Sequence, residues 1–465
     1  MTIIQRLPVI APSGATARFL GDSIRAGGAC STVGVTDASS LLCAEFGLTQ
    51  QNDAVSGTGS HGATTKAYAQ YQPFGPRGNF VNFNAAGHND GLSFTATKTA
   101  AKVGGETRAW LAAIWAETDI AASDPALTKV GTFSTSATDY GDKASARLSG
   151  TPMETSVIGD AISFTANADR DFFINCPSGK GSGGRRIGSF DVLVNGSVVD
   201  SYDGDGQSDC VVDGNPPLTL HARLISGVRK GDVVEIVNTG GAGPMIIISI
   251  GALRPAFDCE SAVRCLPPRP NPACINGSGF YALGGGTGSP AGFDAIDAEI
   301  EAAVEVFANT GRPARVSRTN AVLTAGTMPG PDYEHPNDTG HYQMYNADRK
   351  VLARADQVPV QWTPSLSGLS ECTIQQAIGL RDGKRFEFWV RIDPTGVSFS
   401  ATVLSSTLTL PPGLKVAAPA ALAIVSCGSV KPYPTGLINT GDNKVYLPTA
   451  VFTDATTFHG SVELA

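Results

Sequence analysis

Four short polar motifs follow one another along the chain and could together carry out nucleophilic chemistry. They read Gly21-Asp22-Ser23-Ile24, Asn52-x-Ala54-x-Ser56-Gly57-x-Gly59, Gly87-His88-Asn89-Asp90 and Asp332-x-x-His335-Pro336-Asn337. A serine hydroxyl is a weak nucleophile at neutral pH and needs a nearby base to take its proton. The first motif supplies a serine and the last a histidine, so the set contains the two groups that acyl transfer needs.

In this order the motifs resemble those of the SGNH (GDSL) hydrolases, an esterase family whose blocks carry Ser, Gly, Asn and His. The resemblance covers roughly the first 130 residues and about a hundred residues further on. It implies that Ser23 is the nucleophile, His335 the base and Asp332 the carboxylate that orients the imidazole. It also implies an oxyanion hole built from the backbone N–H groups of Ser23 and Gly57 and the side-chain amide of Asn89.

A second Asp-x-x-His pair follows the last motif. Asp338 and His341 have the same spacing as Asp332 and His335, and spacing alone does not separate the two pairs. Proline and asparagine follow His335, as they do in the family, and this favours the first pair. Asp338 and His341 stay open as the alternative.

Other motifs favour structural interpretations. Residues 57–62 read G-x-G-x-x-G, but we expect no strand before them and no acidic partner after them, so NAD is not expected. Asp203 to Asp209 is rich in oxygen ligands but lacks the spacing of an EF-hand, and a solvated turn is favoured over a calcium loop. His88 is interpreted as a hydrogen-bonded loop histidine without a catalytic role. No cofactor and no metal are therefore expected.

Composition narrows the class of protein. The chain has 465 residues, 42% of them hydrophobic and 16% charged, with a formal net charge of −8. This length predicts several domains, and the absence of a basic stripe argues against nucleic acid as a partner. No apolar stretch reaches the roughly 18 residues of a membrane-spanning helix, so membrane insertion is not expected. The N-terminus lacks an apolar signal segment, so no signal peptide is expected.

The nine cysteines are an odd number and include no C-x-x-C pair. Buried free thiols are therefore expected for most of them, although Cys259, Cys265 and Cys274 lie close enough in sequence for one loop disulfide.

Hydrophobic patterning divides the chain into four parts. Residues 1–133 and 254–356 are expected to be α/β, with helices over Thr107–Ile120 and through Phe293–Phe307. Residues 134–253 between them contain short β-type segments and an Asn195-Gly196 hairpin signal. Residues 357–465 are β again, with apolar residues alternating from Phe386 to Ile392.

These parts predict an α/β protein whose hydrolase core is split by an inserted β-sandwich and followed by a C-terminal β-sandwich module. By the resemblance, the core is an SGNH fold, flavodoxin-like and three-layered. The insert resembles jelly-roll carbohydrate-binding modules, and the tail resembles the terminal β modules of bacteriophage fibres and spikes.

The expected function is a serine carbohydrate esterase that removes O-acetyl groups from a bacterial surface polysaccharide. The tail favours a virion spike or tail fibre, with other virion structural proteins as partners and a homotrimer as one arrangement open to it. One alternative is a glycan-binding adsorption spike with an inactive hydrolase fold. Another is an intracellular lipase or thioesterase.

Overall fold

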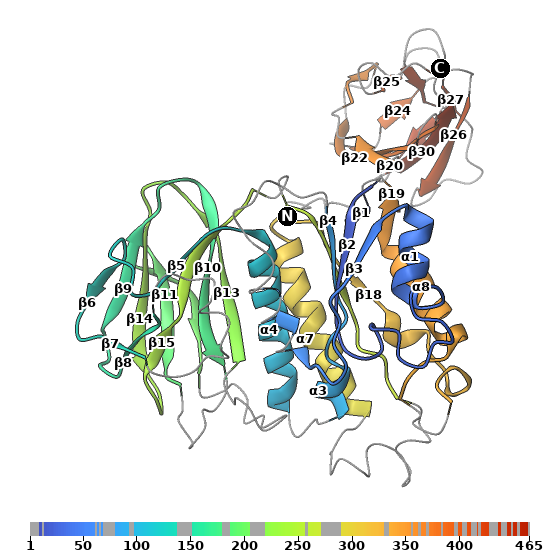
Figure 1. The fold of residues 1–465 in the computed structure, drawn as a ribbon. Coiled ribbons are helices and arrows are strands. Elements are labelled where there is room, and N and C mark those ends of the chain that lie inside the picture. Colours follow the sequence, from blue (N-terminus) through green and yellow to red (C-terminus); the bar gives the residue numbers. More distant parts are fainter. Residues whose placement is uncertain are drawn as a thin grey trace. The chain divides into compact units, whose positions relative to one another are not determined.

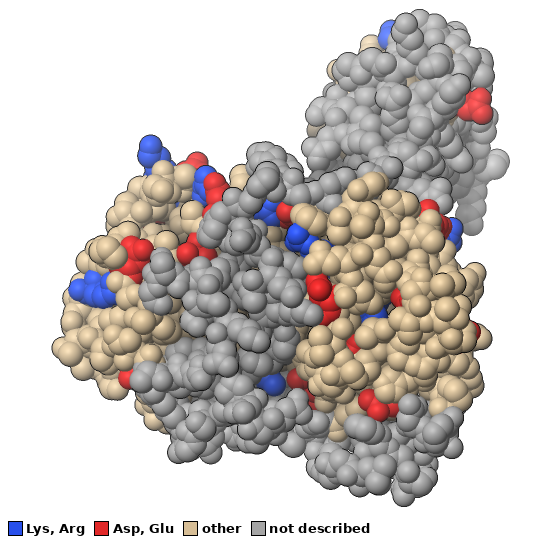
Figure 2. Space-filling model, in the orientation of Figure 1, with Lys and Arg blue, Asp and Glu red and all other residues tan. Residues whose placement is uncertain are grey.

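The computed structural model describes residues 9–11, 14–60, 63–64, 67, 80–92, 97–136, 151–178, 187–204, 219–255, 259–270, 290–329, 334–354, 357–360, 364–368, 372–382, 385–394, 399–401, 407–410, 416, 420–426, 436–438, 444–447, 450–452 and 456–463. The chain forms two compact units, Met1–Ala353 and Arg354–Ala465. In the described part of the chain, no helix is long and apolar enough to cross a membrane. On the face that Figure 2 shows, acidic and basic side chains are scattered among uncharged ones.

A five-stranded parallel sheet lies at the centre of the first unit (Figure 1). Its strands are β2 (Thr16–Leu20), β3 (Thr49–Asn52), β4 (Phe80–Asn84), β17 (Ser261–Cys265) and β18 (Ala314–Ser317). They lie in the order β3-β2-β4-β17-β18, which is 2-1-3-4-5 along the chain. In sheets of this doubly wound kind, ligands bind beyond the carboxyl ends of the strands where the order reverses. Here that point lies between β2 and β4.

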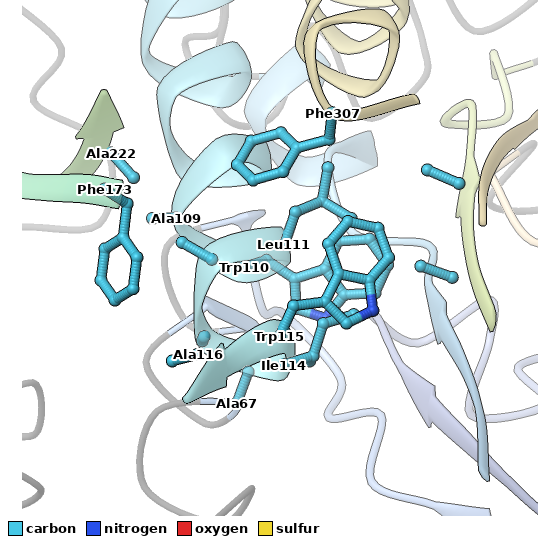
Figure 3. Packing of buried hydrophobic residues seen from close by; sticks show 14 of the residues in the cluster. Ala67, Ala109, Trp110, Leu111, Ile114, Trp115, Ala116, Phe173, Ala222 and Phe307 are labelled. Carbon is cyan, nitrogen blue, oxygen red and sulfur yellow. The ribbon is translucent and has the colours of Figure 1, made fainter. Parts of the chain in front are cut away.

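Helices cover both faces of this sheet (Figure 1). They are α1 (Ala38–Phe46) and α8 (Asp338–Val351) on one face, and α4 (Thr97–Trp115) and α7 (Pro290–Ala308) on the other. Side chains of β17 alternate between the two cores: Ala262 packs with Trp110 and Phe307, whereas Val263 packs with Leu42. Figure 3 shows the first of these cores around α4. A parallel sheet buries both faces in this way, and the predicted α/β class is confirmed.

The helix predicted through Phe293–Phe307 is α7, and the five residues of its apolar stripe are buried. The helix predicted over Thr107–Ile120 is wrong at its end, because α4 stops at Trp115. The strand β5 (Ala116–Ala121) begins there and pairs antiparallel with β16 (Ser249–Leu253). Strand pairing with a distant segment therefore overrides the local helical pattern.

The β region between β4 and β17 is a sandwich. Its two main sheets have the orders β13-β10-β16-β5 and β12-β11-β14-β9-β6, with a smaller sheet β15-β8-β7 beside them. The remaining strands are β6 (Thr128–Val130), β7 (Ser134–Thr135), β8 (Met153–Thr155), β9 (Ala161–Thr165), β10 (Arg170–Ser178), β11 (Ser189–Val194), β12 (Ser197–Tyr202), β13 (Thr219–Val228), β14 (Val233–Gly240) and β15 (Met245–Ile247). One apolar cluster joins both main sheets through residues such as Phe172 and Phe190.

The hairpin predicted at Asn195-Gly196 is confirmed between β11 and β12. Both residues have positive φ, 50° and 78°, as a two-residue turn of type I′ requires.

The sandwich packs directly on α4. Phe173 of β10 and Ala222 of β13 belong to the same buried cluster as Trp110 of α4, and Figure 3 shows them facing that helix. A side chain at Gly105 of α4 would collide with the imidazole of His221, since its Cβ would lie 2.1 Å from Nδ1. The close approach of helix and sheet therefore depends on glycine at this position.

The second unit is all β in its described residues. Its strands are β20 (Gln357–Val360), β21 (Leu366–Ser367), β22 (Cys372–Asp382), β23 (Arg385–Pro394), β24 (Phe399–Ala401), β25 (Thr407–Thr409), β26 (Ala420–Ser426), β27 (Gly436–Ile438), β28 (Lys444–Tyr446), β29 (Ala450–Phe452) and β30 (Thr456–Glu463). Nine of them form one sheet and β24 pairs with β29. The apolar residues of β23, from Phe386 to Ile392, are buried, which confirms the predicted alternation.

Short elements complete the described chain: β1 (Val9–Ala11), which pairs with β19 (Leu352–Arg354), the helix α3 (His88–Leu92), and the 3-10 turns η4 (Thr319–Ala321) and η5 (Ala325–Thr327). The six described cysteines are free thiols, Cys259 and Cys265 among them. Cys274 lies outside the described residues.

A buried ion pair links the segment after β2 to α8. Arg25 Nη2 lies 2.9 Å from Asp348 Oδ2, and both side chains have no exposed surface. Cys265 of β17 completes the group, since Arg25 Nη2 also donates to its Sγ at 3.1 Å. Although burial opposes charge, the Asp348 carboxylate raises the pKa of the Arg25 guanidinium above its ordinary value.

Removal of one partner should therefore be strongly destabilising. We expect Arg25→Met to lower the free energy of unfolding by about 3–5 kcal/mol, because Asp348 would be left as an uncompensated buried charge. The double variant Arg25→Met/Asp348→Asn should recover part of that loss. Urea unfolding measured by circular dichroism gives both values, and a double variant less stable than Arg25→Met would contradict this account.

Candidate active site

Ser23 lies on a tight turn directly after β2. Asp22 Oδ1 accepts a hydrogen bond from the backbone N–H of Ile24 at 3.0 Å, and the N–H of Gly28 donates to the carbonyl of Ser23 at 2.7 Å. Gly21 allows the turn to close, because a Cβ there would lie 2.8 Å from Cβ of Arg25. The turn leaves Ser23 partly exposed while its neighbours Asp22 and Ile24 are buried.

The side chain of His335 meets Ser23 at this turn. Ser23 Oγ–H donates to His335 Nε2 across 2.6 Å, although the two residues are 312 positions apart in the chain. His335 precedes α8, whose first turn is held by Asn337: its side chain accepts from the N–H of Gly340 at 3.0 Å. This contact gives the serine hydroxyl the adjacent base that a nucleophile needs.

The alternative pair lies elsewhere. His341 is fully buried, its Nε2 donates to the carbonyl of Gly28 at 3.0 Å, and its Nδ1 lies 3.5 Å from the N–H of Ala38. Burial lowers the pKa of His341, so this imidazole stays neutral. The carboxylate of Asp338 accepts instead from the N–H and hydroxyl of Ser31.

Asp332 lies outside the described residues, so its role beside His335 stays a prediction. A described carboxylate that acts on the site is Asp22, which precedes the serine. Burial raises the pKa of the Asp22 carboxyl group. The nearby imidazoles of His88 and His335 and the hydrogen bond from the N–H of Ile24 act in the opposite direction. The site therefore holds a desolvated carboxyl group directly beside Ser23, at a residue of the first motif that has no role among the predicted catalytic residues.

The other two motifs meet at the same end of the sheet. The N–H of Val55 donates to the carbonyl of Gly21 at 3.0 Å and ties the second motif to the serine turn. Asn89 Nδ2 donates to the carbonyl of Thr58 at 3.1 Å, which joins the third motif to the second. Gly57 lies between these ties with φ of 76°, a backbone conformation that favours glycine.

Charged side chains support this loop from behind. The carboxylate of Asp90 accepts from the N–H of Ser60 at 2.7 Å, and Lys102 of α4 lies 3.6 Å from Asp90. Glu106, one turn further along α4, lies 4.0 Å from Lys102, and burial raises its pKa to about 8. The helix that carries the sandwich thus also contacts the residues behind the glycine loop.

The glycine-rich residues 57–62 do follow a strand, β3, contrary to the sequence-based expectation. The described part of this segment nevertheless binds another part of the chain. The backbone N–H of Ser60 donates to the carboxylate of Asp90, and a Cβ at Gly59 would lie 3.0 Å from the same carboxylate. A carboxylate in this position would repel a pyrophosphate. No group of three or more metal-ligating side chains occurs within the described ranges, and residues 205–209 lie outside them.

No family model and no curated protein matches the chain. Solved structures that resemble it include a two-domain esterase (CEX) active on acetylated mannans, co-crystallized with mannopentaose. That protein is 14% identical, with 52% of this chain and 92% of that chain covered and a TM-score of 0.28. A family two carbohydrate esterase from Cellvibrio japonicus is 15% identical, with 33% and 37% covered and a TM-score of 0.19.

A family 35 carbohydrate binding module from Clostridium thermocellum is 12% identical, with 29% of this chain and 95% of that chain covered and a TM-score of 0.20. Carbohydrate esterases and carbohydrate-binding modules are thus among the structural neighbours.

Gly28 makes room for the serine–histidine contact and offers a test of it. A Cβ at Gly28 would lie 2.6 Å from Cδ2 of His335 and 2.8 Å from the carbonyl oxygen of Ser23. We expect Gly28→Ala to displace the imidazole and to lower kcat by about 10²-fold, since shifts near 1 Å have effects of this size. Kinetics with an activated ester would measure the change.

Gly326→Ala is the matched control, because the nearest atom to a Cβ there is Thr324 Oγ1 at 4.0 Å. It should keep wild-type kcat. Equal activity of the two alanine variants would show that the spacing of Ser23 and His335 does not limit the reaction.

Proposed function

We propose that this protein is a serine esterase of the SGNH type that acts on O-acylated carbohydrate. The observation that carries the proposal is the 2.6 Å contact between Ser23 Oγ and His335 Nε2 at the carboxyl end of the sheet. A hydroxyl so placed can lose its proton to the imidazole as it attacks an ester carbonyl. Asp332, three residues before His335, is the proposed orienting carboxylate.

The reaction divides into two acyl transfers. Ser23 Oγ forms a bond to the ester carbon while its proton passes to His335 Nε2. The tetrahedral intermediate then expels the alcohol, which takes that proton, and leaves an acyl-Ser23. Water attacks this acyl group next, gives its proton to His335, and releases the acid as Ser23 regains its proton.

Negative charge develops on the carbonyl oxygen in both tetrahedral intermediates. The proposed donors are the N–H groups of Ser23 and Gly57 and the side-chain amide of Asn89. The tie between Asn89 and the carbonyl of Thr58 supports this arrangement, because it holds the amide beside the residue that follows Gly57. Fixed donors of this kind stabilise the transition state more than the substrate.

A carbohydrate substrate is supported by a pocket in the inserted sandwich. The pocket has a volume of about 380 Å³ and combines the rings of Phe164 and Phe172 with the side chains of Asn167 and the Glu117–Arg170 ion pair. Apolar walls with a few polar groups are typical of small-ligand sites. We propose O-acetyl groups of a bacterial surface polysaccharide as the substrate. The virion location, virion partners and a homotrimer stay predictions from the sequence.

Matched glutamine variants of the two histidines test the base. We expect His335→Gln and Ser23→Ala to lower kcat by about 10³-fold or more, because glutamine cannot accept the serine proton. His341→Gln should stay near wild type, since its amide can still donate to Gly28. Hydrolysis of p-nitrophenyl acetate and acetate release from acetylated polysaccharide measure the effect.

If His341→Gln is inactive while His335→Gln remains active, the base belongs to the alternative pair, Asp338 and His341. A wild-type protein that binds glycan but releases no acetate would favour the adsorption scaffold instead. Turnover of long acyl chains in preference to acetate would favour a lipase or thioesterase.

Asn89 provides a separate test of the oxyanion hole. Asn89→Ala should lower kcat by about 10²–10³-fold with little change in KM, because the lost donor acts on charge that develops in the transition state. Steady-state kinetics on the same acetyl ester separate the two constants. A change confined to KM would assign Asn89 to substrate binding.

A further inference from the structure

His88 is completely buried and lies beside the segment that leads to His335. Its Nδ1 lies 2.6 Å from the carbonyl oxygen of Pro268, and its Nε2 lies 3.4 Å from the carboxylate of Glu334. Glu334 directly precedes His335, and Asp22, whose charge also acts on His88, directly precedes Ser23. One imidazole thus contacts the carboxylate of the residue before the base and interacts electrostatically with that of the residue before the nucleophile.

The contacts of His88 determine its charge. A carbonyl oxygen can only accept, so Nδ1 must carry a proton. A neutral ring would then direct the lone pair of Nε2 at the Glu334 carboxylate, which is unfavourable. A second proton on Nε2 turns this contact into an ion pair.

We propose that His88 is a positioning residue: as an imidazolium held by the Pro268 carbonyl and the Glu334 carboxylate, with the Asp22 carboxylate also attracting its charge, it sets the distance between Ser23 and His335. The inference rests on the proposed esterase function and adds a residue to its site. The charge has a direct consequence for geometry, because loss of the proton would leave two carboxylates facing a neutral ring and release the segment before His335.

The surroundings of His88 agree with a positive charge. α7 presents the uncharged ring of Phe293, with ring centroids 6.0 Å apart. The guanidinium of Arg264 of β17, which donates to the carbonyl of Ala86 in the same loop at 2.6 Å, is a cation that opposes this charge. The other groups that face His88 are the Pro268 carbonyl and the carboxylates of Asp22 and Glu334. Burial would lower the pKa of His88, but Glu334 and Asp22 outweigh it and raise the pKa above its ordinary value.

His221 supplies a contrast within the same chain. It is also fully buried, but Arg108 and Arg223 are the charges near it, and burial together with these charges places its pKa well below the ordinary value. The pKa values of two buried histidines are therefore shifted in opposite directions, because carboxylates act on one and guanidinium groups on the other.

NMR titration of the six histidine side chains tests the charge without any substrate. At pH 7 we expect His88 to carry protons on both nitrogens and His221 on one, with assignments from His88→Gln and His221→Gln. Glu334→Gln should move the titration of His88 to lower pH. A neutral His88 at pH 7 would overturn the proposal, as would a titration that Glu334→Gln leaves unchanged.

Labelling of Ser23 by a fluorophosphonate probe tests the consequence. We expect His88→Gln to slow labelling and kcat by about 10- to 100-fold with KM nearly unchanged. Wild type should lose reactivity at alkaline pH as His88 loses its proton. Glu334→Gln should shift this alkaline limb to lower pH, and His221→Gln should leave it in place.

The outcomes separate this inference from the proposed function. Wild-type rates and an unchanged pH profile in His88→Gln would overturn the positioning role while the esterase stands. A wild-type protein that is not labelled by the probe and hydrolyses no ester would contradict the proposed esterase function. In that case, a charged His88 whose removal shifts the His335 resonance would still support the positioning role.

Discussion

The buried ion pair of Arg25 and Asp348 is the contact on which the site depends most. It joins the turn that carries Ser23 to α8, the helix that begins just after His335, and the two partners lie 323 positions apart in the chain. Neither side chain reaches solvent, so neither can exchange its partner for water. A buried charge pair is a weak source of net stability but a strict geometric constraint, because each charge tolerates few other positions. The same contact therefore restricts the positions of Ser23 and His335 relative to each other.

Electrostatic support continues on the other side of the serine turn. Asp22, His88 and Glu334 bring two carboxyl groups and one imidazole into a region buried from solvent, and the carbonyl of Pro268 requires a proton on Nδ1 of the imidazole. Linkage then relates this group to stability. The pKa of His88 is raised above its ordinary 6.5 on folding. The contribution of His88 to the free energy of unfolding is therefore complete below pH 6.5 and is lost as the pH rises through the raised pKa.

The inserted sandwich is part of the same framework. It leaves the core after α4 and returns through β16 to β17, and it packs on α4 through Phe173 and Ala222. α4 in turn carries Lys102, whose ammonium group lies beside Asp90 behind the glycine loop. A shift of the sandwich relative to α4 would therefore also shift Lys102 and the residues that support the proposed oxyanion hole.

The sequence by itself determined the features that depend on local chemistry. The apolar stripe of α7, the hairpin at Asn195-Gly196 and the alternation in β23 follow from periodicity and backbone preference, and the motifs supplied the residue types of the site. Only the tertiary structure decided which histidine meets Ser23, because two Asp-x-x-His pairs have equal spacing. It also ended α4 at Trp115, since the following residues pair with β16. The contact of His88 with Glu334 joins residues far apart in the chain, and such a contact leaves no periodic pattern in the sequence.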